Sequence, residues 1–184
     1  AQAGKQIFCE KPIALDLASI DDALAAVDRA GVKLQIGFNR RFDANFRRVH
    51  QAVAQGEVGR PELLHIISRD PAPPPIAYVK ASGGIFVDMN VHDIDLARWY
   101  LGGSPAKRVF AAGTIAIHEG LRECGDVDNG LSIVEFADGA LACFYASRTL
   151  AHGHETLTEI VGTRGRLTIG QNPRANRVDI HSGR

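Results

Sequence analysis

Hydrophobic and polar positions follow two different periods along the chain and predict two regions. In the first region, apolar runs at residues 6–10 and 32–38 predict two strands. Asp16 is suited to cap a helix between them, and Gly31 is suited to end it. The apolar residues of this helix share one face: Leu17, Ile20, Leu24 and Val27. Strand, helix and strand in this order predict a βαβ unit with a parallel sheet.

The second region begins with a helix and continues mainly as β-structure. Four apolar residues at helical spacing predict the helix: Phe42, Phe46, Val49 and Val53. Four prolines within residues 71–75 predict an extended loop, and a further helix is expected from Gly84 to Leu101. The expected strands are residues 63–68, 108–117, 131–136, 141–147, 157–161 and 167–169. Turn residues at 137–139 and 163–165 predict hairpins, so this region should be a largely antiparallel sheet with one inserted helix.

Composition narrows the class of partner. The chain has 184 residues and a formal net charge of zero, which disfavours a nucleic-acid or membrane-surface partner and favours a small molecule. No apolar run approaches the roughly 18 residues that cross a bilayer. Three cysteines without C-x-x-C spacing favour reduced thiols and a cytoplasmic protein. The missing initiator Met favours a fragment of a longer chain.

The helix expected from Gly84 carries the first candidate for chemistry. Asp88, His92 and Asp95 are spaced to project from one face. A carboxylate one turn from an imidazole can fix its tautomer and stabilise its protonated form, as a general base requires. The alternative is a polar pair on a solvated helix face.

Lys11 and the residues after the second strand form the second candidate. Lys11 follows the first strand of the βαβ unit, at the strand end where open α/β sheets bind ligands. Asn39, Arg40 and Arg41 follow the second strand in the same topological position. Such a set suits a polyhydroxylated or an anionic ligand, and the alternative is solvated surface charge.

Metal binding is the weakest of the site interpretations. His152 and His154 form an H-x-H pattern, and the acidic residues around His92 could be drawn as a metal cluster. The sequence lacks the further histidines and the H-x-x-E-H pattern that such sites use, so no metal ligand is expected. A G-x-G-x-x-G dinucleotide fingerprint is also missing from the sequence.

Four motifs in this order resemble the glucose-fructose oxidoreductase / inositol dehydrogenase / MocA family, and within it the inositol 2-dehydrogenase subgroup. They are Glu10-Lys11-Pro12, residues 37–43 (GFNRRFD), residues 68–71 (SRDP) and residues 82–93 (SGGIFVDMNVHD). Asp126-Val127-Asp128-Asn129 is also similar to that subgroup. The resemblance implies an α+β chain: residues 1–40 would end a Rossmann-like NAD-binding domain, and residues 41–184 would form a substrate-binding and oligomerisation domain with an open antiparallel sheet and an inserted active-site helix.

The resemblance also implies a reaction and its residues. The whole protein would oxidise a ring hydroxyl of an inositol, most simply myo-inositol, with NAD, whereas this part alone should be inactive without the glycine-rich segment. Lys11 would bind the reacting hydroxyl, His92 would take its proton, and Asp88 would support His92. The expected cofactor contacts are Glu10, Lys11, Pro12 and Arg40, and the expected substrate contacts are Asn39, Arg40, His152 and His154.

Other interpretations stay open at this stage. The two histidines at 152 and 154 stand where many inositol dehydrogenases have tyrosines, so scyllo-inositol or another sugar or polyol is an alternative substrate. A non-catalytic module that forms a homodimer or homotetramer through its sheet is a hypothesis of a different class, because the predicted sheet lacks a covering helix on one face. Metal-dependent hydrolysis is a third.

Overall fold

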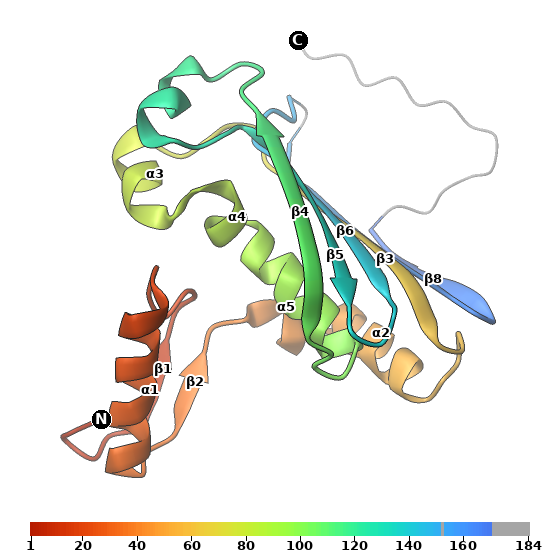
Figure 1. Ribbon diagram of the computed structural model, residues 1–184, viewed down its shortest axis with the longest axis horizontal. Coiled ribbons are helices and arrows are strands. Elements are labelled where there is room, and N and C mark those ends of the chain that lie inside the picture. Colours follow the sequence, from red (N-terminus) through yellow and green to blue (C-terminus); the bar gives the residue numbers. More distant parts are fainter. Residues whose placement is uncertain (152, 171–184) are drawn as a thin grey trace.

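The computed structural model describes residues 1–151 and 153–170. Its N-terminal unit contains β1 (Ile7–Cys9), α1 (Leu17–Ala30) and β2 (Leu34–Ile36), and β1 and β2 pair in parallel (Figure 1). The Asp16 carboxylate accepts the Ser19 backbone N–H at 2.8 Å, and Gly31 ends the helix with a φ of 62°. Both caps and the βαβ unit are therefore confirmed.

A six-stranded sheet forms the body of the chain, with the order β4-β5-β6-β3-β7-β8. Its strands are β3 (Pro61–Arg69), β4 (Ala106–Thr114), β5 (Asn129–Phe136), β6 (Leu141–Ser147), β7 (Glu155–Gly162) and β8 (Gly165–Ile169). All neighbouring strands are antiparallel except β3 and β6. The expected antiparallel sheet and both hairpin turns are confirmed, and the parallel pair is an addition that no local pattern indicates.

The helices differ more from the sequence-based expectation. They are η1 (Asn39–Phe42), α2 (Ala44–Ala54), α3 (Ile76–Ser82), α4 (Gly84–Asp88), α5 (Asn90–Tyr100) and η2 (Glu119–Cys124). The helix expected from Gly84 to Leu101 is confirmed in its extent but forms two helices, because the hydrogen-bonded run is interrupted at Met89. The short helix α3 was not expected. It starts directly after Pro75, whose fixed φ of −52° is compatible with a helix start.

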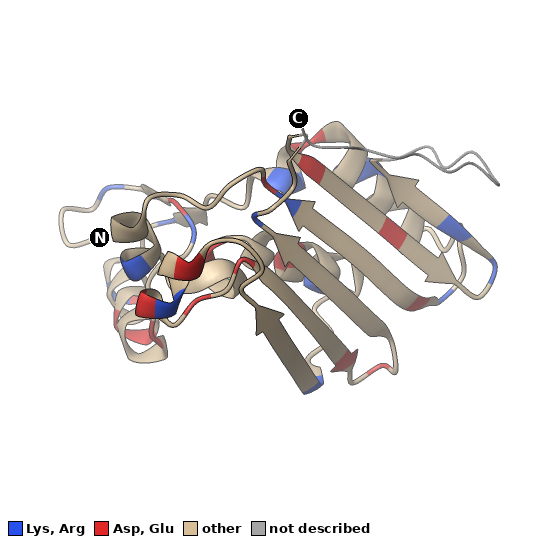
Figure 2. Ribbon diagram, turned by 90° about the horizontal axis from the view of Figure 1, so that it is seen from above, with Lys and Arg blue, Asp and Glu red and all other residues tan. Residues whose placement is uncertain are grey.

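The helices of the described residues cover one face of the sheet. α4 and α5 pack against β3, β5 and β6, and α2 packs against β8 (Figure 1). Leu96 and Tyr100 of α5 meet Ile66, Phe144 and other buried residues of the strands in the main core. In the view of Figure 2 the strands carry few charged residues. Among the described residues, no helix has the length and apolar run that crossing a bilayer would require.

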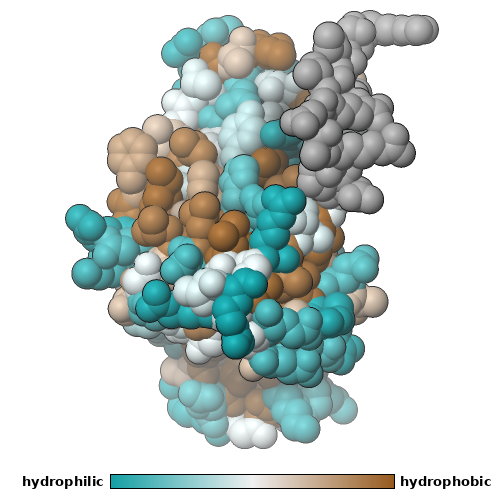
Figure 3. Space-filling view, turned by 90° about the vertical axis from the view of Figure 1, so that its right-hand side faces the viewer, coloured by the Kyte–Doolittle hydropathy of each residue, from teal (hydrophilic) through white to brown (hydrophobic). Residues whose placement is uncertain are grey.

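The opposite face of the sheet is apolar, and no helix within residues 1–151 or 153–170 covers it. Cross-strand pairing aligns Phe110, Ile133 and Cys143 in one row, and Leu131 and Tyr145 in the next. Phe110 is 62% exposed and Ile133 is 42% exposed. Figure 3 shows hydrophobic side chains gathered on the side of the molecule that faces right in Figure 1. The strands thus separate a packed face, which positions the site, from an uncovered one.

Candidate active site

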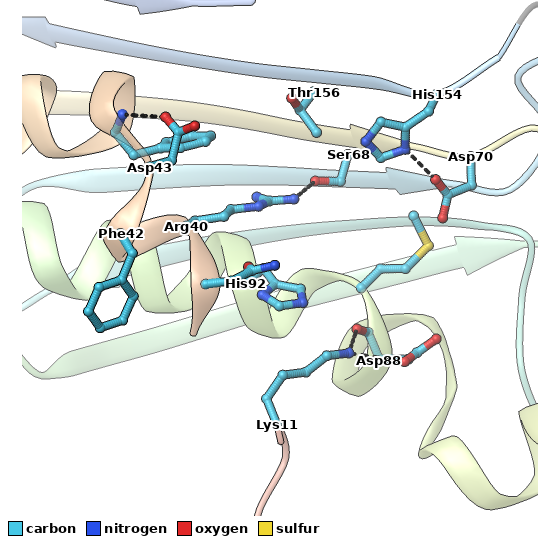
Figure 4. Close-up of a pocket in the computed structure, with 13 residues that line it drawn as sticks. Lys11, Arg40, Phe42, Asp43, Ser68, Asp70, Asp88, His92, His154 and Thr156 are labelled. Carbon is cyan, nitrogen blue, oxygen red and sulfur yellow. Dashed lines mark hydrogen bonds and ion pairs between the residues drawn. The ribbon is translucent and has the colours of Figure 1, made fainter. Parts of the chain in front are cut away.

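A cavity of about 740 Å³ lies where the N-terminal unit meets the helices and the sheet. Residues after β1 and β2 form one wall, α4 and α5 form another, and the ends of β3 and β7 close it (Figure 4). The lining residues are Lys11, Asn39, Arg40, Phe42, Asp43, Phe46, Ser68, Asp70, Asp88, Met89, His92, His154 and Thr156. The two segments proposed from the sequence, one after β1 and one on the inserted helices, therefore face each other across one space.

Lys11 is held by Asp88 in two ways. The Lys11 Nζ donates to the backbone oxygen of Asp88 at 2.6 Å and lies 3.2 Å from its Oδ1. Asp88 is the last residue of α4, so its carbonyl is free of the helix ladder and can accept this bond. The ammonium is thereby fixed at the cavity wall, with only 15% of the side chain exposed.

The Asp88 carboxylate also receives two donors from outside the cavity. The Tyr78 hydroxyl donates to Oδ1 at 2.9 Å, and the Arg148 Nη2 donates to Oδ2 at 3.1 Å. The hydrogen bond from Tyr78 to Asp88, together with burial, raises the pKa of Tyr78. Among the described residues no hydrogen bond joins Asp88 to His92, so the expected dyad does not form here by direct contact. The nearby Lys11 and Arg148 cations explain why the carboxylate turns toward them.

His92 presents a neutral imidazole to the cavity. Burial, with Arg40 and Lys11 nearby, lowers its pKa to about 4, and the charges of Asp95 and Asp88 oppose this shift without cancelling it. The Nδ1 atom is buried without a hydrogen-bond partner in the described structure. The imidazole and the Phe38 ring form a T-shaped pair with a centroid distance of 6.4 Å. A neutral ring at neutral pH is the form that can accept a proton.

Arg40 belongs to a second polar cluster at the cavity wall. Its guanidinium binds Asp93 through Nη1 and donates to the Ser68 hydroxyl through Nη2 at 3.0 Å. Ser68 in turn donates to Asp93 at 2.8 Å, and Asn90 donates to the other oxygen at 2.9 Å. Asp93 is fully buried, and these donors satisfy its charge. The Arg40 charge is therefore neutralised within the protein.

His154 lies at the exposed rim of the cavity. Its Nδ1 is 2.6 Å from Oδ1 of Asp70, and the two side chains are 63% and 38% exposed (Figure 4). The backbone of Asp70 is anchored, since its N–H donates to Ser147 and its carbonyl accepts from Leu150. His152, the other expected contact, lies outside the described residues.

The remaining expected residues have different positions. Asn39 lines the cavity, whereas Pro12 lines a second cavity of about 240 Å³ that shares Lys11 and Asp88 with the first. Glu10 lies against the backbone of Gly37: a Cβ there would come within 2.8 Å of its Oε2. Asp95, which shares a helix face with His92, accepts two bonds from Arg41 at 2.6 and 2.7 Å.

Several residues of the site were assigned no role in catalysis or substrate binding from the sequence, although Asp93 is among the acidic residues considered for a metal site. They are Ser68, Asp70, Tyr78, Asp93 and Arg148. Asp93 and Arg148 are the strongest cases, because each is a fully buried charge. The sequence signal that could have drawn attention to Arg148 is its position directly after an apolar strand. The partners of such a residue come from distant segments, so local spacing cannot name them.

Comparison with known families gives two matches along the chain. Residues 46–168 match the family described as "GFO/IDH/MocA C-terminal domain". Residues 1–38 match the family described as "Oxidoreductase family, NAD-binding Rossmann fold". The first match alone spans more than half of the chain.

Individual relatives agree with these matches. A myo-inositol 2-dehydrogenase of Thermotoga maritima is 44% identical over 91% of the chain and 50% of its own length. A scyllo-inositol 2-dehydrogenase (NAD(+)) of Bacillus subtilis is 41% identical over 92% of the chain and 49% of its own length. The structure of scyllo-inositol dehydrogenase from Lactobacillus casei with bound NAD(H) and scyllo-inositol is 37% identical, with a TM-score of 0.84, over 98% of the chain and 55% of that protein. The chain thus spans about half the length of these relatives.

Proposed function

Because the chain belongs to the GFO/IDH/MocA oxidoreductase family, we propose that it is the catalytic and substrate-binding part of an NAD-dependent inositol dehydrogenase. The reaction would oxidise a ring hydroxyl to a ketone, with myo-inositol as the first choice of substrate and scyllo-inositol as the alternative. Residues 1–40 would be the end of the Rossmann-like domain, and residues 41–184 the substrate and oligomerisation domain. The grouping of Lys11, Asp88 and His92 around one cavity supports this proposal most strongly.

The charges of the cavity favour a neutral polyol over an anionic substrate. Its two cationic side chains are already neutralised, Lys11 by Asp88 and Arg40 by Asp93. Asp43 and Asp70 add further carboxylates to the wall. A ligand with its own carboxylate or phosphate would find no unpaired cation among the described lining residues, whereas hydroxyl groups can both donate and accept bonds here. Of the two ligand types suggested by the sequence, the polyhydroxylated one fits.

The residues also fit a nicotinamide cofactor beside the substrate. The cavity lies at the carboxyl ends of parallel strands β1 and β2, where such sheets bind dinucleotides. Its volume of about 740 Å³ exceeds the need of a single polyol ring. Lys11 and Arg40 would contact the cofactor from the cavity wall, and Glu10 and Pro12 would shape its edge. When bound, NAD⁺ supplies the two-electron oxidant.

The side chains would have separate roles in the oxidation of the substrate hydroxyl. His92, neutral at physiological pH, would accept the hydroxyl proton at a ring nitrogen. The Lys11 ammonium would donate a hydrogen bond to the same oxygen and stabilise the negative charge that develops there. Asp88 would hold Lys11 in place by the two contacts described above. Asn39, Asp70 and His154 would bind the remaining hydroxyl groups of the ring.

The decisive experiment uses the full-length enzyme with the His92→Ala substitution. We expect kcat for inositol-dependent NADH formation to fall by at least about 10²-fold, because the general base is lost. The Kd for NAD should stay within about twofold, since His92 would act on the substrate. His118→Ala is the matched control, because His118 lies outside the cavity, near η2. Wild-type turnover in the His92 variant would contradict the assignment.

A second function rests on the open face of the sheet. Exposed apolar side chains on three adjacent strands form a continuous surface whose contact with water is unfavourable. They include Phe110, Ile133 and Leu141. A homodimer or homotetramer that packs two such faces together would cover it. This function is compatible with the dehydrogenase.

A further inference from the structure

We propose that Arg148 is a positioning residue of the active site. It holds Lys11 in its reactive position by forming an ion pair with Asp88 from outside the cavity. This inference rests on the proposed function for its kinetic consequence only. Arg148 follows β6, is 1% exposed and does not line the cavity. Its two ion pairs, to Asp88 and Asp126, connect the interior of the sheet domain with the wall of the site.

Arg148 and Asp126 together hold both ends of the short helix α4. At the start of α4, Oδ1 of Asp126 accepts the backbone N–H of Ile85 at 2.9 Å. At its end, Asp88 receives the Arg148 Nη2 at 3.1 Å. Arg148 Nη1 and Asp126 Oδ2, 2.9 Å apart, close the loop between the two ends. Gly84 accommodates this approach, because a Cβ there would lie 2.7 Å from Asp126 Oδ1.

The charges alternate along this chain of contacts. Lys11, Asp88, Arg148 and Asp126 form a neutral row that leads from the cavity into the core. A buried ion pair seldom stabilises a fold more than well-packed apolar residues would, because both charges lose their hydration. The role of this row is therefore better explained by the position that it gives to Asp88 than by a contribution to the stability of the fold.

The geometry of Asp88 shows how the effect reaches Lys11. One carboxylate oxygen, Oδ1, contacts Lys11 and Tyr78, and the other, Oδ2, contacts Arg148. A guanidinium can hold two carboxylates in fixed directions at once, whereas an ammonium acts as a point charge. Without this fork the carboxylate can rotate away from Lys11. The ammonium then keeps only its bond to the Asp88 backbone carbonyl and becomes less restrained.

The test compares Arg148→Met, Arg148→Lys and Asp126→Asn. Asp126→Asn keeps an oxygen for the Ile85 N–H and removes the charge that faces Arg148. The first measurement uses the chain itself: competitive acetylation of Lys11, read by mass spectrometry against the exposed Lys33. We expect Lys11 to be acetylated faster in Arg148→Met than in the wild type, with smaller increases in the other two variants.

The second measurement uses the full-length enzyme with inositol and NAD⁺. Because a displaced catalytic group costs up to about 10²-fold in rate, kcat should fall about 10- to 100-fold in Arg148→Met. KM should change little, since Arg148 does not touch the cavity, and Arg148→Lys should restore part of kcat. Arg48→Met is the control: it removes a two-bond ion pair between Arg48 and Glu57, neither of which lines the cavity, and should leave both readouts unchanged.

The outcomes separate the two hypotheses. Unchanged Lys11 acetylation and unchanged kcat in folded Arg148 variants would overturn the positioning role. If Arg148→Met does not fold, Asp126→Asn and Arg148→Lys decide the question by the same two readouts. If the wild-type enzyme does not oxidise inositol, the proposed function fails, while the acetylation result still decides whether Arg148 positions Lys11.

Discussion

At the scale of single residues, the site depends on a histidine that resists protonation. Burial and the Arg40 and Lys11 cations lower the pKa of His92 to about 4, whereas an imidazole in an unfolded chain has a pKa of about 6.5. The folded state therefore binds this proton less readily than the unfolded state. The stability that neutral His92 contributes is present above about pH 6.5 and is lost as the pH falls toward 4.

The lowered pKa of His92 predicts how the thermal stability of the chain depends on pH. Between about pH 7 and about pH 4.5, Tm should fall more in the wild-type chain than in His92→Gln, because the glutamine at position 92 cannot take up a proton. The measurement is thermal unfolding followed by circular dichroism at both pH values. His118→Gln is the control and should behave like the wild type. Parallel losses in the wild type and in His92→Gln would show that His92 titrates normally.

The cavity residues show what sequence reasoning can and cannot reach. Lys11, Asn39, Arg40, Asp88 and His92 were all expected from strand ends and helical spacing, and all line one cavity. Their partners were not expected. The arginine of each ion pair and its carboxylate lie in different segments, and only the folded chain brings them together. Local spacing therefore predicts where a charge is placed, but not what neutralises it.

At the scale of elements, one carboxylate organises the connection between β4 and β5. Asp128 is fully buried and accepts the backbone N–H groups of Ala116, Ile117 and His118 at 2.8 to 3.0 Å. Burial raises its pKa, but these bonds outweigh that effect and lower it to about 2. This single side chain thus holds the start of the segment that contains η2.

Asp128→Asn should therefore destabilise the fold. Bonds to a charged acceptor are worth about 1.5–3 kcal/mol, so we expect the free energy of unfolding to fall by about 2 kcal/mol at neutral pH. The lowered pKa means that this contribution is present above about pH 4 and is lost as the pH falls toward 2. Urea denaturation at several pH values measures both effects. Asp138→Asn, in an exposed turn, is the control and should have a much smaller effect; equal losses would contradict the role of Asp128.

The elements themselves were predicted well where a cap or a turn marks them. Asp16 and Gly31 bound α1, and the two hairpin turns lie where glycine and polar residues predict them. The interruption at Met89 was missed because the sequence there has neither proline nor glycine. It follows from tertiary contacts, since the Asp88 carbonyl binds Lys11. The parallel pairing of β3 and β6 was missed for a similar reason, because it joins distant segments.

At the scale of the whole molecule, the open sheet face predicts self-association. Ile133 lies in the middle of that face and is 42% exposed, so Ile133→Lys should place a charge in the contact without disturbing the core. Light scattering after size exclusion should give a multiple of the chain mass for the wild type and the monomer mass for the variant. Val109→Lys, on the opposite face of β4, is the control and should keep the wild-type mass. A monomeric wild type would contradict the prediction.

The place of β3 in the sheet has a consequence for the biosynthesis of the protein. β3 lies between β6 and β7, so Ile66 pairs with Phe144 on one side and with Thr158 on the other. While a ribosome is still translating the residues between, β3 has no neighbour on either edge. Contacts that join such distant segments form slowly. The nascent chain must therefore keep an apolar strand unpaired until β6 emerges, and open on its other edge until β7 follows, which makes protection by chaperones important during synthesis.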